Sequence, residues 1–261
     1  MISTESLICK LQDCFNKKES YLLLFSGGFD SSAVLGVLKK AQINVKPIWV
    51  DNGMNRMAAQ DVQIQASVLG AENLEIIQIN PDSKTKANPV DRCYVCKLAI
   101  LKAVADRGLV MLDGTNASDS KVYRPGSKAL KEMKVQSPLM QCGIDGPQAK
   151  EIALALGART DIAGLESCLA TRINYNLEIT EERITTIRDI ERYIINKTED
   201  YTTRCRMDSL EHLRIEITSP DSFALLSQHE HREKLSQLNN LTTFLTMDLK
   251  PYRLNEHDKK I

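Results

Sequence analysis

A glycine-rich turn between an apolar run and a helical pattern constrains this chain most strongly. Residues 21–25 predict a buried strand, and the sequence Ser-Gly-Gly-Phe-Asp-Ser-Ser follows at residues 26–32. Glycines allow a tight turn, and the free N–H groups at the start of a helix attract phosphate oxygens. No lysine follows the glycines, so the loop differs from the P-loop of kinases and GTPases. We expect it to bind a nucleotide through Ser26, Gly27, Gly28, Ser31 and Ser32, with Asp30 orienting the loop or holding Mg²⁺.

The first 170 residues alternate apolar runs with helical patterns, an order typical of strands connected by helices. The runs span residues 21–25, 45–50, 74–79 and 109–112, and helical patterns start near Ser31, Ala58 and Asp91. Continuous apolar strands separated by helices predict an α/β fold with a parallel sheet. Ligands bind such sheets where the strands end. We therefore add to the expected nucleotide site the residues Asp51, Gly114, Thr115 and Asn116.

Beyond about residue 170 the pattern changes to that of a smaller α+β unit. A long helix is predicted after Thr180, because isoleucines recur at helical spacing and two glutamates occupy its first turn. Alternating residues at 203–207 and 213–217 predict a strand pair, followed by a helix at 223–238 and a strand at 243–249. We therefore predict two domains, residues 1–170 and 171–261.

Charge and hydropathy argue against several classes of function. The chain has 34 basic and 34 acidic residues, so no global positive field attracts nucleic acid, and we expect a small-molecule substrate. No apolar run approaches about 18 residues and the N-terminal residues lack the pattern of a signal peptide, so we predict a cytoplasmic protein without a membrane partner. Seven cysteines, an odd number, favour reduced thiols over a disulfide scaffold.

Two cysteines one helical turn apart, Cys93 and Cys96, form a C-x-x-C pair. Two thiolates supply only half of a tetrahedral metal site, so a third ligand is needed. Cys168 is the strongest candidate, because the positive charge of the nearby Arg172 would favour a thiolate. We expect Cys14 and Cys205 to be core residues, because both lie on apolar faces. Cys142 stays open as a candidate for a fourth ligand.

Six short motifs span nearly the whole chain: S-G-G-F-D-S-S, N-P-V-D-R-C-Y-V-C-K, D-G-T-N-A-S-D, Y-R-P-G, S-C-L-A-T-R-I and L-T-M-D-L. Together they resemble the LarE family of ATP-dependent sulfur-insertion enzymes, and the first resembles the PP-loop of ATP pyrophosphatases. The resemblance implies an adenine nucleotide alpha hydrolase-like PP-loop domain with a smaller C-terminal domain. It also implies ATP and Mg²⁺ as cofactors and, as substrate, a pyridinium dicarboxylate mononucleotide that is the precursor of a nickel-pincer cofactor.

The same resemblance implies how sulfur would be inserted. The enzyme would adenylate a carboxylate of the nucleotide and replace its oxygen by sulfur from sulfide or another donor, releasing AMP and pyrophosphate. Family members either hold a [4Fe-4S] cluster with three cysteines or sacrifice the sulfur of one cysteine. Cys93, Cys96 and Cys168 match the first kind, and a sacrificial Cys168 stays the alternative. The expected catalytic residues are then Asp30, Cys168 and Arg172.

Four arginines are the expected clamps for the substrate phosphate: Arg124, Arg172, Arg204 and Arg206. Arg204 and Arg206 alternate with Cys205 on one predicted strand, so both guanidinium groups should project from the same face. The alternative for this pair is a solvated strand face. We also expect the protein to form a homo-oligomer.

Three other functions remain as alternatives. A tRNA-thiolating PP-loop enzyme would share the loop and the cluster, but it should carry a basic surface or an RNA-binding module, and the sequence indicates neither. An amide-forming PP-loop ligase would leave the three cysteines unused. A nucleotide-sensing module with structural zinc would need a fourth zinc ligand, and the histidines all lie at residue 212 or later, far from the C-x-x-C pair in sequence.

Overall fold

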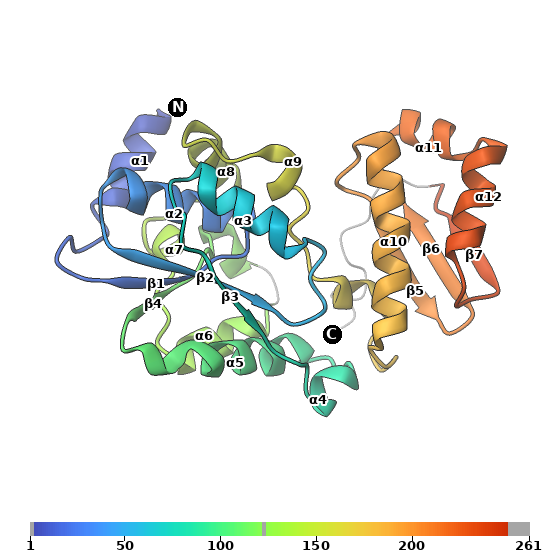
Figure 1. Cartoon of the computed structure of the whole chain (residues 1–261), viewed down its shortest axis with the longest axis horizontal. Coiled ribbons are helices and arrows are strands. Elements are labelled where there is room, and N and C mark those ends of the chain that lie inside the picture. The colour runs from blue at the N-terminus through green and yellow to red at the C-terminus, as the bar shows by residue number, and fades with distance from the viewer. Residues whose placement is uncertain (1–2, 122–123, 250–261) are drawn as a thin grey trace. The chain divides into compact units, whose positions relative to one another are not determined.

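The computed structural model describes residues 3–121 and 124–249, which form two compact units (Figure 1). The first unit comprises the chain up to Asn80 together with Asp91–Glu166, and the second comprises Pro81–Val90 together with the chain from Ser167. The ten residues Pro81–Val90 thus belong with the C-terminal part, which the sequence did not indicate. The domain limits at residues 1–170 and 171–261 stay a prediction.

A parallel four-stranded sheet in the order β3-β2-β1-β4 forms the centre of the first unit. Its strands are β1 (Tyr21–Leu24), β2 (Val45–Asp51), β3 (Glu75–Gln78) and β4 (Val110–Leu112). β1 lies in the middle, with Tyr21 opposite Val45 on one side and opposite Val110 on the other. The α/β class and the parallel sheet predicted from the apolar runs are confirmed. Because β2 and β4 flank β1, the loops that follow these three strands lie next to one another.

Helices cover both faces of this sheet, as Figure 1 shows with α2 and α8 on one side and α5 and α6 on the other. Neighbouring residues of β1 point to opposite faces: Leu23 packs in the core that contains Val34 of α2, and Leu22 packs with Val104 of α5. The longer helices of the unit are α1 (Thr4–Gln12), α2 (Phe29–Lys40), α3 (Ala59–Val68), α5 (Arg92–Val104) and α8 (Gly146–Ala155). The shorter ones are η1 (Ala105–Arg107), η2 (Ala117–Lys121), α6 (Gly126–Glu132), α7 (Pro138–Gln141) and α9 (Thr160–Ala163).

A three-stranded mixed sheet and a long helix form the second unit. Its strands are β5 (Arg204–Ser209), β6 (His212–Glu216) and β7 (Phe244–Met247), with β5 antiparallel and β7 parallel to β6. The helices are α4 (Ser83–Lys86), η3 (Leu169–Arg172), α10 (Glu181–Thr198), α11 (Pro220–Leu226) and α12 (His229–Leu238). The long helix and the strand pair expected here are confirmed. Thr180 caps α10 by accepting a hydrogen bond from the Arg183 backbone N–H at 3.3 Å.

The single helix predicted at 223–238 is wrong, because two helices occupy this segment. α11 ends at Leu226, and the Ser227 hydroxyl donates a 2.7 Å hydrogen bond to the Phe223 carbonyl oxygen. The Ser227 backbone N–H donates to the same carbonyl oxygen at 3.0 Å, so Ser227 closes the last turn of α11. Gln228 then takes an extended conformation, with ψ of 149°, at the N-cap position of α12. The chain therefore changes direction at Ser227 and Gln228, between the two helices.

Asn88 explains why Pro81–Val90 belongs to the second unit. Its side-chain amide donates to the carbonyl oxygens of Ile173, Asn174 and Leu177 at 3.3, 2.8 and 2.9 Å. Asn88 is fully buried and has a φ of +58°, a left-handed conformation that asparagine tolerates better than most residues. The first residue of the N-P-V-D-R-C motif is thus a structural anchor.

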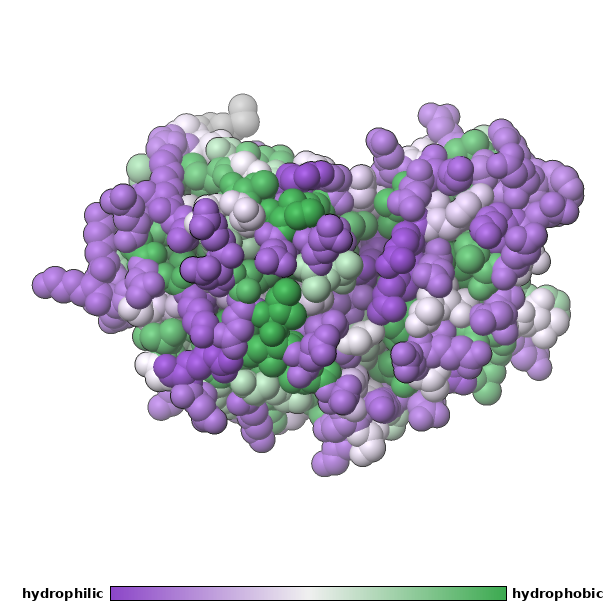
Figure 2. Space-filling model, viewed as in Figure 1, coloured by the Kyte–Doolittle hydropathy of each residue, from purple (hydrophilic) through white to green (hydrophobic). Residues whose placement is uncertain are grey.

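Hydrophilic residues cover most of the face drawn in Figure 2, with several hydrophobic patches between them. The large apolar side chains that are exposed include Val68, Leu154, Leu210 and Phe244. In residues 3–121 and 124–249, no helix combines the length and the apolar character that crossing a bilayer requires.

Candidate functional site

The loop after β1 places an uncapped helix N-terminus at the edge of the sheet. Gly28 is the N-cap of α2 and offers no side-chain hydrogen bond, while Gly27 has a φ of +83°, which favours glycine. The Ser26 and Ser31 hydroxyl oxygens lie 3.0 Å apart, and the Ser31 hydroxyl donates to the Gly28 carbonyl oxygen at 3.2 Å. The loop therefore presents backbone N–H groups and hydroxyls at one point, which is an arrangement suited to an anion.

The loop after β4 packs directly against the start of α2. The Asn116 side-chain amide donates to the Asp30 carboxylate at 2.9 Å. Gly114 is in such close contact that a Cβ atom at this position would lie 2.7 Å from the Ser31 backbone nitrogen. Asp30, Ser31, Gly114 and Asn116 were expected from sequence as parts of one nucleotide site, and they come from loops that meet in the first unit. Whether they bind ATP stays a prediction.

In this region the carboxyl group of Asp30 has a pKa far from its ordinary value. The pKa of its carboxyl group is raised to about 6, chiefly by burial and also by the negative charges of Asp119 and Glu166, although the Asn116 hydrogen bond and the Arg124 charge lower it. The charged form of Asp30 is thus costly in the protein alone. A cation bound beside the carboxylate would favour that charged form.

The loop after β2 is held by its own side chains. The Asp51 carboxylate accepts hydrogen bonds from the Gly53 backbone N–H at 2.9 Å and from the Asn55 amide at 3.3 Å. The next residue, Asn52, is buried, and its amide donates to the Cys96 sulfur at 3.3 Å. This loop therefore connects the edge of the sheet to the C-x-x-C pair.

The predicted thiol ligands are divided between the two units. Cys93 and Cys96 lie one turn apart on α5, and both are partly exposed. Cys168 is exposed and precedes η3 in the second unit. Within residues 3–121 and 124–249, no three histidine, cysteine or acidic side chains gather as a metal site. The ligand set of Cys93, Cys96 and Cys168 stays a prediction.

Two other cysteines differ from the expectation of reduced thiols. Cys14 and Cys142 are joined as a disulfide between the C-terminal ends of α1 and α7. Cys14 is exposed, so its expected place in the core is wrong, and Cys142 is not a free thiol that could serve as a fourth ligand. Cys205 is fully buried as expected, and this burial raises the pKa of its thiol.

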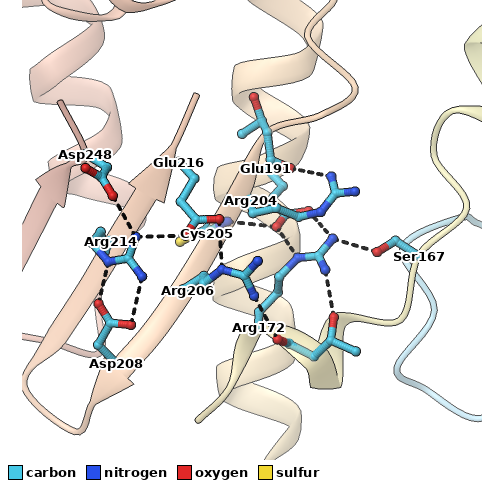
Figure 3. A network of polar contacts seen from close by, with 12 residues as sticks. Ser167, Arg172, Glu191, Arg204, Cys205, Arg206, Asp208, Arg214, Glu216 and Asp248 are labelled. Atoms are coloured by element: carbon cyan, nitrogen blue, oxygen red, sulfur yellow. Dashed lines mark hydrogen bonds and ion pairs between the residues drawn. The ribbon is translucent and has the colours of Figure 1, made fainter. Parts of the chain in front are cut away.

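The expected clamps Arg172 and Arg206 are buried and bound to carboxylates (Figure 3). The Arg172 guanidinium donates to Glu191 Oε1 and to Ser167 Oγ, both at 2.7 Å. Arg206 donates to Glu216 Oε2 at 2.8 Å and to the Thr171 carbonyl oxygen at 3.2 Å. A phosphate at either arginine would therefore compete with an existing ion pair.

The other two expected clamps have different surroundings. Arg204 donates to the backbone carbonyl oxygens of Tyr201 and Thr203, at 3.1 and 2.8 Å. Arg124 belongs to the first unit, where its half-exposed side chain forms a 2.7 Å ion pair with Asp119. The role of all four arginines in phosphate binding stays a prediction.

Sequence reasoning missed the acidic partners of this network and Arg214. Arg214 contacts Asp208, Glu216 and Asp248 at 2.6, 2.8 and 3.0 Å, and its hydrogen bonds to Asp208 and Glu216, together with their charges, raise its pKa. Glu191 is fully buried on α10 and also accepts a hydrogen bond from the Cys205 backbone N–H at 2.8 Å. A signal was present, because the Arg-x-Arg of β5 lies across from the Arg-x-Glu of β6, with Arg206 directly opposite Arg214.

Comparison with known proteins adds relatives of similar length. No established family model matches the chain. An uncharacterized protein of Synechocystis is 30% identical over 199 residues, covering 73% of this chain and 74% of the relative. An uncharacterized protein of Methanocaldococcus jannaschii is 28% identical, covering 69% of this chain and 71% of the relative. The pyridinium-3,5-bisthiocarboxylic acid mononucleotide synthase of Lactiplantibacillus plantarum is 25% identical over 203 residues, covering 72% and 70%.

The parallel sheet, with its polar loops at the carboxyl ends of β1, β2 and β4, defines a Rossmann-like α/β protein with a small mixed-sheet unit. The similar proteins place the chain more narrowly within this class of Rossmann-like proteins. The chain belongs to the LarE-like family.

Proposed function

We propose that the protein is an ATP-dependent sulfurtransferase that inserts sulfur into a pyridinium dicarboxylate mononucleotide, a nickel-pincer cofactor precursor. The observation that carries the proposal is the contact between Asp30 and Asn116 beside the uncapped N-terminus of α2. It joins two loops suited to a nucleotide phosphate. The 25% identity to a synthase of a bisthiocarboxylic acid mononucleotide supports the choice of substrate class.

The chemistry requires activation of a carboxylate, because its oxygen is a poor leaving group. Attack of the carboxylate on the α-phosphate of ATP releases pyrophosphate and forms an acyl-adenylate, from which sulfur then displaces AMP. The backbone N–H groups and hydroxyls from Ser26 to Ser32 would bind the pyrophosphate, and Asp30 would hold Mg²⁺. Binding of the metal ion would in turn stabilise the ionised Asp30 carboxylate.

The thiols fit an iron–sulfur cluster in chemical type, since such clusters are held by cysteine thiolates. Cys93 and Cys96 share one side of α5, because residues three apart lie on the same helix face. We propose that they hold a [4Fe-4S] cluster together with Cys168. A cluster held by three cysteines would leave one iron open to bind sulfide.

The products of ATP turnover test the first half of the proposal. We expect phosphorus NMR to detect AMP and pyrophosphate, with Asp30→Ala abolishing turnover. The matched control is Asp13→Ala, because Asp13 is an exposed carboxylate at the end of α1 and should not affect turnover. ADP and orthophosphate as the direct products of the wild-type protein would contradict the proposal.

The exposure of Cys168 favours a second candidate, in which this cysteine is the sulfur source. Loss of its sulfur would leave dehydroalanine, about 34 Da lighter, whereas a ligand cysteine stays intact. Mass spectrometry of the Cys168 peptide after reaction with ATP and the nucleotide substrate separates the two mechanisms. Dehydroalanine at this position would replace the cluster mechanism, and an intact cysteine with bound iron would support it.

A further inference from the structure

The two cysteines of the C-x-x-C pair, Cys93 and Cys96, differ in their hydrogen bonding to the loop after β2. The Cys96 sulfur accepts a 3.3 Å hydrogen bond from the Asn52 amide, and this contact links α5 to the loop after β2 across 44 residues of sequence. No such amide contact from this loop reaches Cys93 among the hydrogen bonds of the described chain. The pair is therefore asymmetric in its surroundings.

The orientation of the Asn52 amide is fixed by a second contact. The Met54 backbone N–H donates to the side-chain oxygen of Asn52, Oδ1, at 3.0 Å. A backbone N–H can only donate, so the oxygen must face Met54 and the NH₂ group must face the sulfur. Asn52 is only 6% exposed, and a donor at this depth favours a protein partner over water.

The loop that carries Asn52 is itself held in place. Asp51 accepts from the Gly53 backbone and from the Asn55 amide, and the Asn55 amide also donates to the Val50 carbonyl oxygen at 3.2 Å. Gly53 has a φ of +75°, so the turn depends on a glycine. The donor therefore comes from a rigid turn, which suits a residue that must hold another side chain in one position.

We propose that Asn52 is the positioning residue for Cys96, fixing its sulfur as the oriented member of the C-x-x-C pair. This inference rests on the proposed function, because it takes Cys93 and Cys96 as ligands of the cluster that takes part in sulfur transfer. A hydrogen bond to a ligand sulfur withdraws electron density and orients the ligand, and such donors tune the potential of a bound cluster. Asn52 also joins that sulfur to the loop of Asp51, an expected nucleotide residue.

The first experiment examines the contact in the metal-free full-length protein. The Asn52 side-chain amide is followed by ¹⁵N–¹H NMR and identified by its disappearance in Asn52→Asp. We expect Cys96→Ala to shift these two amide signals, and the matched variant Cys93→Ala to leave them in place. Unshifted signals in Cys96→Ala would overturn the inference, whether or not the protein binds a cluster.

The second experiment measures the reduction potential of the protein reconstituted anaerobically with iron and sulfide. Asn52→Asp keeps the oxygen that accepts from Met54 but replaces the N–H donor with an anion, so we expect a shift to a more negative potential. Asn44→Asp makes the same chemical change at an exposed residue before β2, where the amide donates to Ser20, and should leave the potential unchanged.

The outcomes separate the inference from the function on which it rests. An unchanged potential in Asn52→Asp with the cluster present would overturn the positioning role. If the wild-type protein takes up no cluster, the cluster proposal fails, and the NMR comparison alone decides whether Asn52 positions Cys96.

Discussion

Replacing Asp30 by asparagine should stabilise the first unit in a manner that depends on pH. The pKa of this carboxyl is raised from 3.8 to about 6, so the folded protein binds a proton more tightly than the unfolded chain. Stability from this group is fully present below pH 3.8 and is lost as pH rises through 6. The shift spans about two pH units at about 1.4 kcal/mol each, so the ionised carboxylate costs up to about 3 kcal/mol. Asparagine removes that cost and retains an oxygen to accept from Asn116.

The assay is urea unfolding at pH 4 and pH 7.5, followed by tryptophan fluorescence. Trp49 is the one tryptophan of the sequence, and it is buried in the same core as α2, so it reports on the unit that contains Asp30. We expect Asp30→Asn to gain up to about 3 kcal/mol more at pH 7.5 than at pH 4. Asp13→Asn, at the exposed end of α1, is the matched control and should follow the wild-type pH dependence.

Equal effects of Asp30→Asn at the two pH values would refute the reasoning. So would a loss of stability confined to pH 7.5, because it would mean that the ionised carboxylate is stabilised by its surroundings. The variant should also lose ATP turnover, and this loss combined with a gain in stability would distinguish a functional carboxylate from a structural one.

Three further variants test other parts of the structure. Gly114→Ala should destabilise the first unit by about 1 to 3 kcal/mol, because the alanine Cβ would lie 2.7 Å from the Ser31 backbone nitrogen, and it should weaken ATP binding measured by calorimetry. The control Gly126→Ala, whose Cβ would lie 3.5 Å from the nearest atom, should change neither stability nor ATP binding. Glu191→Gln should lower the free energy of unfolding of the second unit, measured by chemical denaturation, by about 3 to 5 kcal/mol, because Arg172 stays buried without its charge partner. The double variant Arg172→Met with Glu191→Met should recover most of that loss. Lys40→Ala should change stability by less than about 1 kcal/mol, since its ion pair with Glu5 is exposed, and a larger thermal shift would contradict this estimate.

The apolar runs predicted the first unit well because its central strand, β1, is buried on both faces. Residues such as Leu22 and Leu23 both needed to be apolar, so the run itself indicated a buried strand. The meeting of the loops that carry Asp30 and Asn116 also followed from topology, since both lie after strands of one parallel sheet.

Side-chain partners that the order of the strands does not imply were not predictable from the sequence. Asn88 lies in a motif that suggested chemistry, yet its amide binds carbonyl oxygens more than 80 residues away. The alternating arginines of β5 suggested a phosphate clamp, but their pairing depends on which residues the neighbouring strand and α10 place opposite them. A charge pattern in the sequence shows which charged residues share a strand face, but the partner of each charge is set by the folded structure.

The path of the chain between the two units has a topological consequence. The chain passes from one unit to the other at Asn80, Val90 and Glu166, so three peptide connections join them. A single cut at any one junction leaves the other two intact, and a truncation at Glu166 would remove the residues to which Asn88 is anchored. Cys93 lies three residues after the second junction and Cys168 two residues after the third. Two of the three connections between the units therefore stand directly before the two cysteine segments of the chain.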